Sequence, residues 1–263
     1  MTFANIPALI TSAFPPGVSG DDVLFLAACA FIAGLARGFS GFGAALIFMP
    51  LASAVVGPKL AAAILFIADL FTSWPMIPDA VRKANKQQVA TMLIGSLAGV
   101  PVGTFALAHG DPLFLRWAII LLVCLLLALL ASGWRYRGQP TTAATIGVGA
   151  VSGVFAGAAQ VGGPPVIAYW LGGAHPASLV RANIVFFFAL GTVITGVSYW
   201  LSDVLTIAAA ALALVVGPLF GIGIAIGSRM FGVTSEVHFR QICYGLVALA
   251  VVLGLPVLDP WLR

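Results

Sequence analysis

Long apolar segments separated by short polar loops make up most of the 263-residue chain. Two of these segments are interrupted by small residues rather than by charged loops, at residues 37–43 and 157–165. Apolar arms of 14 and 13 residues, at 23–36 and 44–56, flank the first interruption. Each arm is shorter than the roughly 20 residues that a membrane-spanning helix needs. The pattern predicts a re-entrant or broken helical hairpin, which a membrane accepts only where protein or water covers the backbone.

The other apolar segments predict ordinary membrane-spanning helices, and the second half of the chain follows the plan of the first. The expected fold is therefore an all-α polytopic membrane protein. A tail at 1–22 would precede a first repeat at 23–137 and a second repeat at 138–263. The expected spans are 60–78, 89–108 and 113–134 in the first half, then a hairpin from 142–157 and 166–172 with spans at 181–200, 204–228 and 239–258.

Glycines at matching positions support an internal duplication. Each repeat would have a hairpin and three spans, an odd number of crossings, so the second repeat is expected to be inverted relative to the first. Transporters built from inverted repeats bind their substrate near the middle of the bilayer, between the repeats. The matches are Gly34, Gly38 and Gly43 with Gly153, Gly157 and Gly162 at an offset of 119, and Gly99 and Gly103 with Gly223 and Gly227 at an offset of 124.

Composition and charge strengthen the membrane assignment. Hydrophobic residues make up 61% of the chain and charged residues only 8%, against about 25% charged in soluble domains. The basic residues are spread through short loops, so nothing indicates nucleic-acid binding. If the loop at 79–87 is cytoplasmic, alternation of the spans places eight of the twelve basic residues inside. The positive-inside rule then predicts that both termini lie outside.

The two chain breaks are the candidate binding site. Helices that restart after a break expose unpaired N–H groups and a partial positive charge, which suit an anion. Glycine allows the turn and lets an oxyanion approach the backbone. The alternative is that the glycines only permit close helix packing, and that the polar side chains only cap backbone. The candidate residues in the breaks are Ser40, Gly41, Phe42 and Gly43 in the first, and Gln160, Gly162 and Gly163 in the second.

Four further polar residues inside or beside apolar segments are candidates for function. Arg37 either attracts substrate or reaches to the cytoplasmic interface, since a buried arginine needs a pathway or a partner. Asp69 either forms an ion pair, with Arg37 as the candidate partner, or carries a proton. Arg181 could bind an entering anion or serve as a positive-inside anchor. Asn183, one turn into a span, is a candidate substrate ligand.

The whole pattern, from about residue 23 to 255, resembles the sulfite exporter TauE/SafE family. The resemblance rests on Gly-Phe-Ser-Gly-Phe-Gly at 38–43 with Pro50, on Gly-Gly-Pro-Pro at 162–165, and on Arg-Ala-Asn at 181–183. It implies a multi-pass carrier in the bacterial inner membrane that moves sulfite, an organosulfonate such as sulfoacetate, or a related sulfur anion. Arg37 and Gln160 are not family-wide features, so the resemblance does not specify the substrate.

Alternatives to this interpretation are a carrier for an unrelated carboxylate, a membrane accessory protein and a membrane-embedded enzyme. The sequence has no phosphate-binding loop, zinc-protease motif or nucleophile elbow, so we expect a transporter that uses no cofactor and no metal. Cys29, Cys124 and Cys243 lie in apolar segments without metal-binding spacing. The sequence leaves open whether transport is coupled to protons and whether the protein forms a homodimer.

Overall fold

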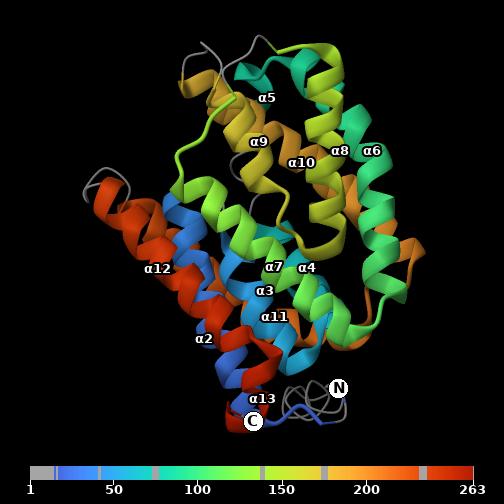
Figure 1. The fold of residues 1–263 in the computed structure, drawn as a ribbon, viewed down its shortest axis with the longest axis vertical. Coiled ribbons are helices and arrows are strands. Elements are labelled where there is room, and N and C mark those ends of the chain that lie inside the picture. The colour runs from blue at the N-terminus through green and yellow to red at the C-terminus, as the bar shows by residue number, and fades with distance from the viewer. Residues whose placement is uncertain are drawn as a thin grey trace, which may run out of the picture.

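The computed structural model is a bundle of helices, with no strand among the residues that it describes (Figure 1). These are residues 15, 17–40, 43–72, 77–136, 140–172, 177–230 and 236–262. The predicted all-α class is thus confirmed. The first half contains α2 (Gly20–Ser40), α3 (Ala44–Val56), α4 (Pro58–Thr72), α5 (Ile77–Lys83), α6 (Lys86–His109) and α7 (Pro112–Ala131). The second contains α8 (Thr142–Ala159), α9 (Gly163–Trp170), α10 (Ala177–Leu201), α11 (Ile207–Met230), α12 (Glu236–Gly254), the 3-10 turn η3 (Pro256–Leu258) and α13 (Asp259–Leu262).

Helix starts follow from local sequence. The side chain of Asn85 accepts a hydrogen bond from the backbone N–H of Gln88 at 3.1 Å and caps α6. Asp111 caps α7 in the same way, with Pro112 in the first helical turn. Side chains of this kind satisfy N–H groups that have no partner inside the helix.

Six of the described helices are long and apolar enough to cross a membrane. They are α2, α6, α7, α8, α10 and α11. The expected span at 60–78 corresponds to two helices, α4 and α5, which are bent by 76° relative to each other, so this segment is a broken span or a re-entrant loop. Residues 73–76 of the expected span lie outside the described residues.

The arms of the two hairpins differ in length. The expected short arm at 23–36 is wrong, since α2 has 21 residues. It begins earlier because Ser19 and Asp22 exchange hydrogen bonds, the Ser19 N–H with the carboxylate at 2.8 Å and the Asp22 N–H with the hydroxyl at 3.2 Å. The returning arms α3 and α9 have only 13 and 8 residues. Each hairpin therefore joins a span-length helix to a short one.

Two helix pairs pack with almost no space between their backbones, and each pair takes one helix from each half of the chain. A Cβ atom added to Gly99 of α6 would lie 2.1 Å from the carbonyl oxygen of Ala150 in α8. One added to Gly38 of α2 would lie 2.2 Å from the carbonyl oxygen of Ile224 in α11. By the sequence offsets, α8 corresponds to α2 and α11 to α6, so the two contacts are equivalent.

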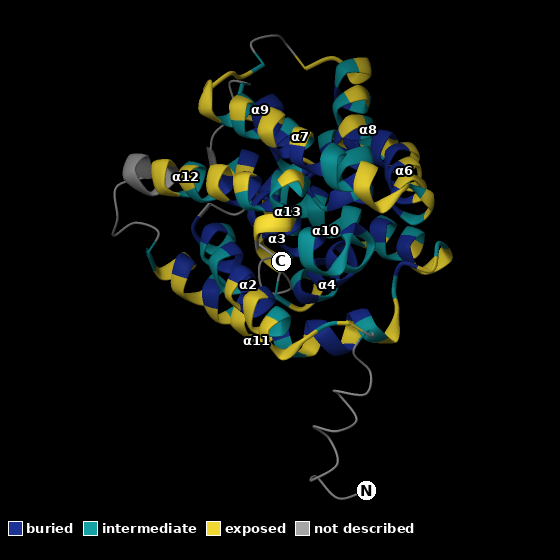
Figure 2. Ribbon diagram, turned by 60° about the horizontal axis from the view of Figure 1, so that its bottom comes forward, coloured by how far each residue is buried: buried dark blue, intermediate teal, exposed yellow. Residues whose placement is uncertain are grey.

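The short helix of the first hairpin, α3, is enclosed by α2, α4, α7 and α12. Residues 44–53 of α3 are all buried, whereas α6 and α11 alternate buried and exposed positions along their length (Figure 2). The start of α2 and the C-terminal α13 lie at one end of the molecule, and α5 and the start of α8 lie at the other (Figure 1). The two long hairpin arms thus run inward from opposite ends.

We predict that Gly99→Ala destabilises the protein by roughly 1–3 kcal/mol, because the added methyl group overlaps backbone atoms of α8 that cannot move independently. Gly147→Ala in α8 is the matched control, since a Cβ atom there meets nothing within 4 Å. Thermal unfolding of both variants in detergent measures the difference. Equal melting temperatures would contradict the close contact between α6 and α8.

Candidate functional site

The two chain breaks meet at one cavity of about 80 Å³, which is well above the roughly 10–15 Å³ that a single water molecule needs. Arg37 and Gly43 of the first break line it, with Ala44 and Ala45 at the start of α3, and the lining residues of the second break include Gln160, Gly162 and Gly163. The other lining residues are Arg37, Leu46, Leu65, Asp69, Ser96, Val100, Ser152, Ala156, Val161, Pro164, Phe187, Phe188, Gly191, Thr192 and Thr195.

Both short hairpin helices begin at this cavity without a side-chain cap. Helix α3 follows Gly43, whose φ of 101° is a left-handed conformation that glycine adopts without strain. No hydrogen bond links the N–H groups of Ala44 and Ala45 to any residue that the structure describes. The N–H of Leu46, the next residue, donates to the carbonyl of Gly43. Helix α9 follows Gly162 and likewise has no side-chain cap.

The second break is held by two hydroxyl groups. Gln160 ends α8 with a φ of 60°, in the left-handed region. Its side-chain Nε2 donates to the Tyr199 hydroxyl at 3.2 Å, and that hydroxyl donates to the carbonyl of Gly157 at 3.0 Å. Ser152 donates to the carbonyl of Gly162 at 2.7 Å. The bond to Tyr199 uses one of the two hydrogens of the Gln160 side-chain amide and fixes the orientation of that side chain.

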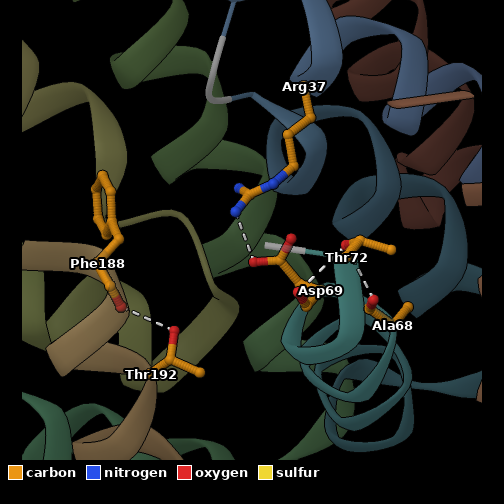
Figure 3. Close-up of polar contacts among 6 residues, drawn as sticks. All are labelled: Arg37, Ala68, Asp69, Thr72, Phe188 and Thr192. Carbon is orange, nitrogen blue, oxygen red and sulfur yellow. Dashed lines mark hydrogen bonds and ion pairs between the residues drawn. The ribbon is translucent and has the colours of Figure 1, made fainter. Parts of the chain in front are cut away.

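Arg37 and Asp69 form an ion pair at the edge of the same cavity (Figure 3). One guanidinium nitrogen of Arg37, in the last turn of α2, lies 2.7 Å from a carboxylate oxygen of Asp69 in α4. Their side chains are 24% and 21% exposed. The ion-pair alternative for Asp69 is therefore confirmed, and the proton-carrier alternative stays a prediction.

Two of the other predicted site residues lie away from the cavity. Asn183 is buried, and its side chain accepts from the Asn85 N–H at 2.7 Å and donates to the Gln88 side chain at 3.2 Å. It thereby joins α10 to the start of α6, where the four backbone N–H groups of a helix need partners. Arg181 is exposed on α10 and does not line the cavity.

The structure describes only part of the first chain break. Ser40 ends α2, but its side chain lies outside the described residues, as do Gly41 and Phe42. No group of three or more metal-ligating side chains occurs in the described part of the chain.

Sequence reasoning missed the hydroxyl groups of the cavity. Ser96 and Ser152 lie on the glycine-rich faces of α6 and α8, and Thr192 and Thr195 lie three residues apart on α10. A polar residue on the small-residue face of a span was the available signal, because that face packs against protein rather than lipid.

Comparison with known proteins gives one match. A family model described as sulfite exporter TauE/SafE matches residues 26–254. A search of curated proteins and a search of solved structures found no match. The matched segment covers well over half of the chain and includes both chain breaks and every residue that lines the cavity. The chain therefore belongs to the sulfite exporter TauE/SafE family of membrane anion transporters.

Proposed function

We propose that the cavity is the anion-binding site of a secondary transporter, an exporter or facilitator, in the bacterial inner membrane. The observation that carries the proposal is the convergence of two uncapped helix starts and one arginine on a single cavity. Each helix start contributes a partial positive charge of roughly half an elementary charge. The N–H groups without a partner among the described residues are those of Ala44 and Ala45 at α3 and those of Gly162 and Gly163 at α9, because Pro164 and Pro165 have no N–H. Arg37 adds a full charge and several donors.

Sulfite is the anion that the description of the family names, and a small organosulfonate is the chemically related candidate. Such an anion has several oxygen acceptors around one centre, and these can be met by donors arriving from different helices. A small carboxylate could be met by the same donors, so it remains the second substrate class within this proposal. Arg181 and Asn183 are not part of the proposed site, because neither lines the cavity.

Alternating access would follow from inverted repeats. Three features support this arrangement. The arms α2 and α8 enter from opposite ends (Figure 1). The short helices α3 and α9 begin at the same cavity. Each close-packed pair contains one helix from each half of the chain. The site would then lie between the repeats, and the gates on either side of it would be equivalent. In the predicted orientation both termini lie outside.

The ion pair offers a means of coupling transport to protons. Arg37 and Asp69 together are neutral, so a bound anion would leave the site with a net negative charge in a poorly solvated space. Protonation of Asp69 would remove that excess and would free Arg37 for the substrate. Among the helices packed on α4, which are α3, α6, α7, α8, α10 and α11, no other charged side chain lines the described cavity. Arg37 is therefore the charge that faces Asp69.

We predict that Arg37→Gln lowers anion flux into proteoliposomes by about tenfold or more, because it removes charge-assisted hydrogen bonds to the substrate. Arg82→Gln, at an exposed position on α5, is the matched control and should keep the wild-type flux. The double variant Arg37→Gln/Asp69→Asn keeps the pair neutral and so tests binding separately from folding. Normal flux in both Arg37 variants would remove Arg37 from the site.

We predict that Asp69→Asn retains anion flux but loses its dependence on a proton gradient, since an amide cannot take up a proton at neutral pH. Flux is compared in proteoliposomes with an imposed pH difference and with none, at equal anion concentration. The wild type should transport the anion faster when a proton gradient is imposed in the direction of transport than when there is no gradient. A variant that keeps the same response would show that Asp69 has only a structural role.

A further inference from the structure

Three hydroxyl groups of the cavity are arranged to accept hydrogen bonds rather than to donate them. Ser96, Ser152 and Thr192 line the cavity, and each donates its single hydrogen to a backbone carbonyl. A carbonyl oxygen can only accept, so the direction of these bonds is fixed. What each hydroxyl still offers to a ligand is a lone pair. The carbonyls belong to Gly149 at 3.0 Å, Gly162 at 2.7 Å and Phe188 at 2.8 Å, respectively.

A fourth hydroxyl indicates that the cavity is built for a ligand. Thr195 is only 3% exposed, lines the cavity and makes no hydrogen bond to any residue that the structure describes. Its oxygen is not among the fully enclosed side-chain atoms that lack a partner in the described residues, so the hydroxyl opens onto the cavity. Thr195 therefore remains able to donate, as do the N–H groups of Ala44 and Ala45 at the start of α3 and those of Gly162 and Gly163 at the start of α9. Arg37 contributes its positive charge.

The cavity thus offers two kinds of partner. Arg37, Thr195 and the helix starts supply donors, which suit the oxygens of an anionic group. Ser96, Ser152 and Thr192 supply acceptors, which suit an O–H or N–H group. A fully deprotonated oxyanion, which has acceptors only, would leave these three lone pairs facing its oxygens or would force the hydroxyls to give up their carbonyl bonds. Unmatched polar groups of this kind discriminate strongly between ligands.

From this arrangement we infer that the substrate is a small anion that also carries a hydrogen-bond donor. A hydroxy- or amino-substituted sulfonate and a singly protonated oxyanion belong to this class, whereas an unsubstituted alkyl sulfonate does not. The inference rests on the proposed function, because it assumes that the cavity holds the transported anion. It adds that the side of the anion away from its charge is recognised through its hydrogens.

Thr192 and Thr72 provide a matched pair of variants (Figure 3). Both are threonines whose hydroxyl donates to a carbonyl of their own helix, Thr192 to Phe188 and Thr72 to Ala68 at 3.1 Å. They occupy equivalent positions in the two halves, at a sequence offset of 120. Only Thr192 lines the cavity. Substitution by valine keeps the shape of either side chain and removes its oxygen.

The test compares 2-hydroxyethanesulfonate with ethanesulfonate, which has the same charge and lacks only the hydroxyl group. Uptake and equilibrium binding are measured for the wild type, Thr192→Val, Thr72→Val and Ser96→Ala in proteoliposomes and in detergent. The wild type should prefer the hydroxylated anion by about tenfold, the worth of one or two hydrogen bonds. Thr192→Val and Ser96→Ala should each reduce that preference, and Thr72→Val should keep it.

The outcomes separate the inference from the proposed function. Equal transport of the two sulfonates, with both still dependent on Arg37, would overturn the inference and leave the proposed function standing. A preference that is unchanged in Thr192→Val and Ser96→Ala would also overturn it. If no anion requires Arg37 for binding or flux, the proposed function fails and the inference fails with it.

Discussion

Loss of hydration is the constraint on which this structure depends. A small anion leaves water only if fixed donors replace its hydration shell, and an isolated charge in a poorly polar interior is strongly disfavoured. The proposed site meets this requirement with backbone more than with side chains. Two short helices, α3 and α9, begin beside one cavity and have no side-chain cap. In the proposed site, the N–H groups of Ala44 and Ala45 and those of Gly162 and Gly163 are held in place before an anion arrives, so little reorganisation is needed on binding.

The position of these helix starts depends on glycine. Where α6 meets α8 and α2 meets α11, any side chain larger than hydrogen would overlap the backbone of the neighbouring helix. These close contacts bring the breaks of the two halves to one place. The proposed repeat does not extend to charge, because Arg37 and Asp69 correspond to Ala156 and Ala189 at offsets of 119 and 120. The ion pair that lines the described cavity therefore has no counterpart at the matching positions of the second half.

Much of this could be predicted from the sequence. The glycine matches between the halves predicted that the breaks would be equivalent, and the depth of Arg37 and Asp69 in apolar segments predicted that they needed partners. Other features depend on contacts between distant helices. Asn183 was a reasonable ligand candidate until its amide was found joined to Asn85 and Gln88. The roles of Ser96, Thr192 and Thr195 depend on which face of each helix points to the cavity, and local sequence does not determine that rotation.

The central claim is that the transported anion sits between the starts of α3 and α9. Its most direct test is a structure of the protein with a bromine-substituted hydroxyalkanesulfonate, located by the anomalous scattering of bromine. The account predicts one peak inside the cavity, with the sulfonate oxygens within hydrogen-bond distance of the Arg37 guanidinium and of N–H groups in residues 44–45 or 162–163. A fully occupied peak elsewhere in the protein, with the cavity holding only water, would contradict it.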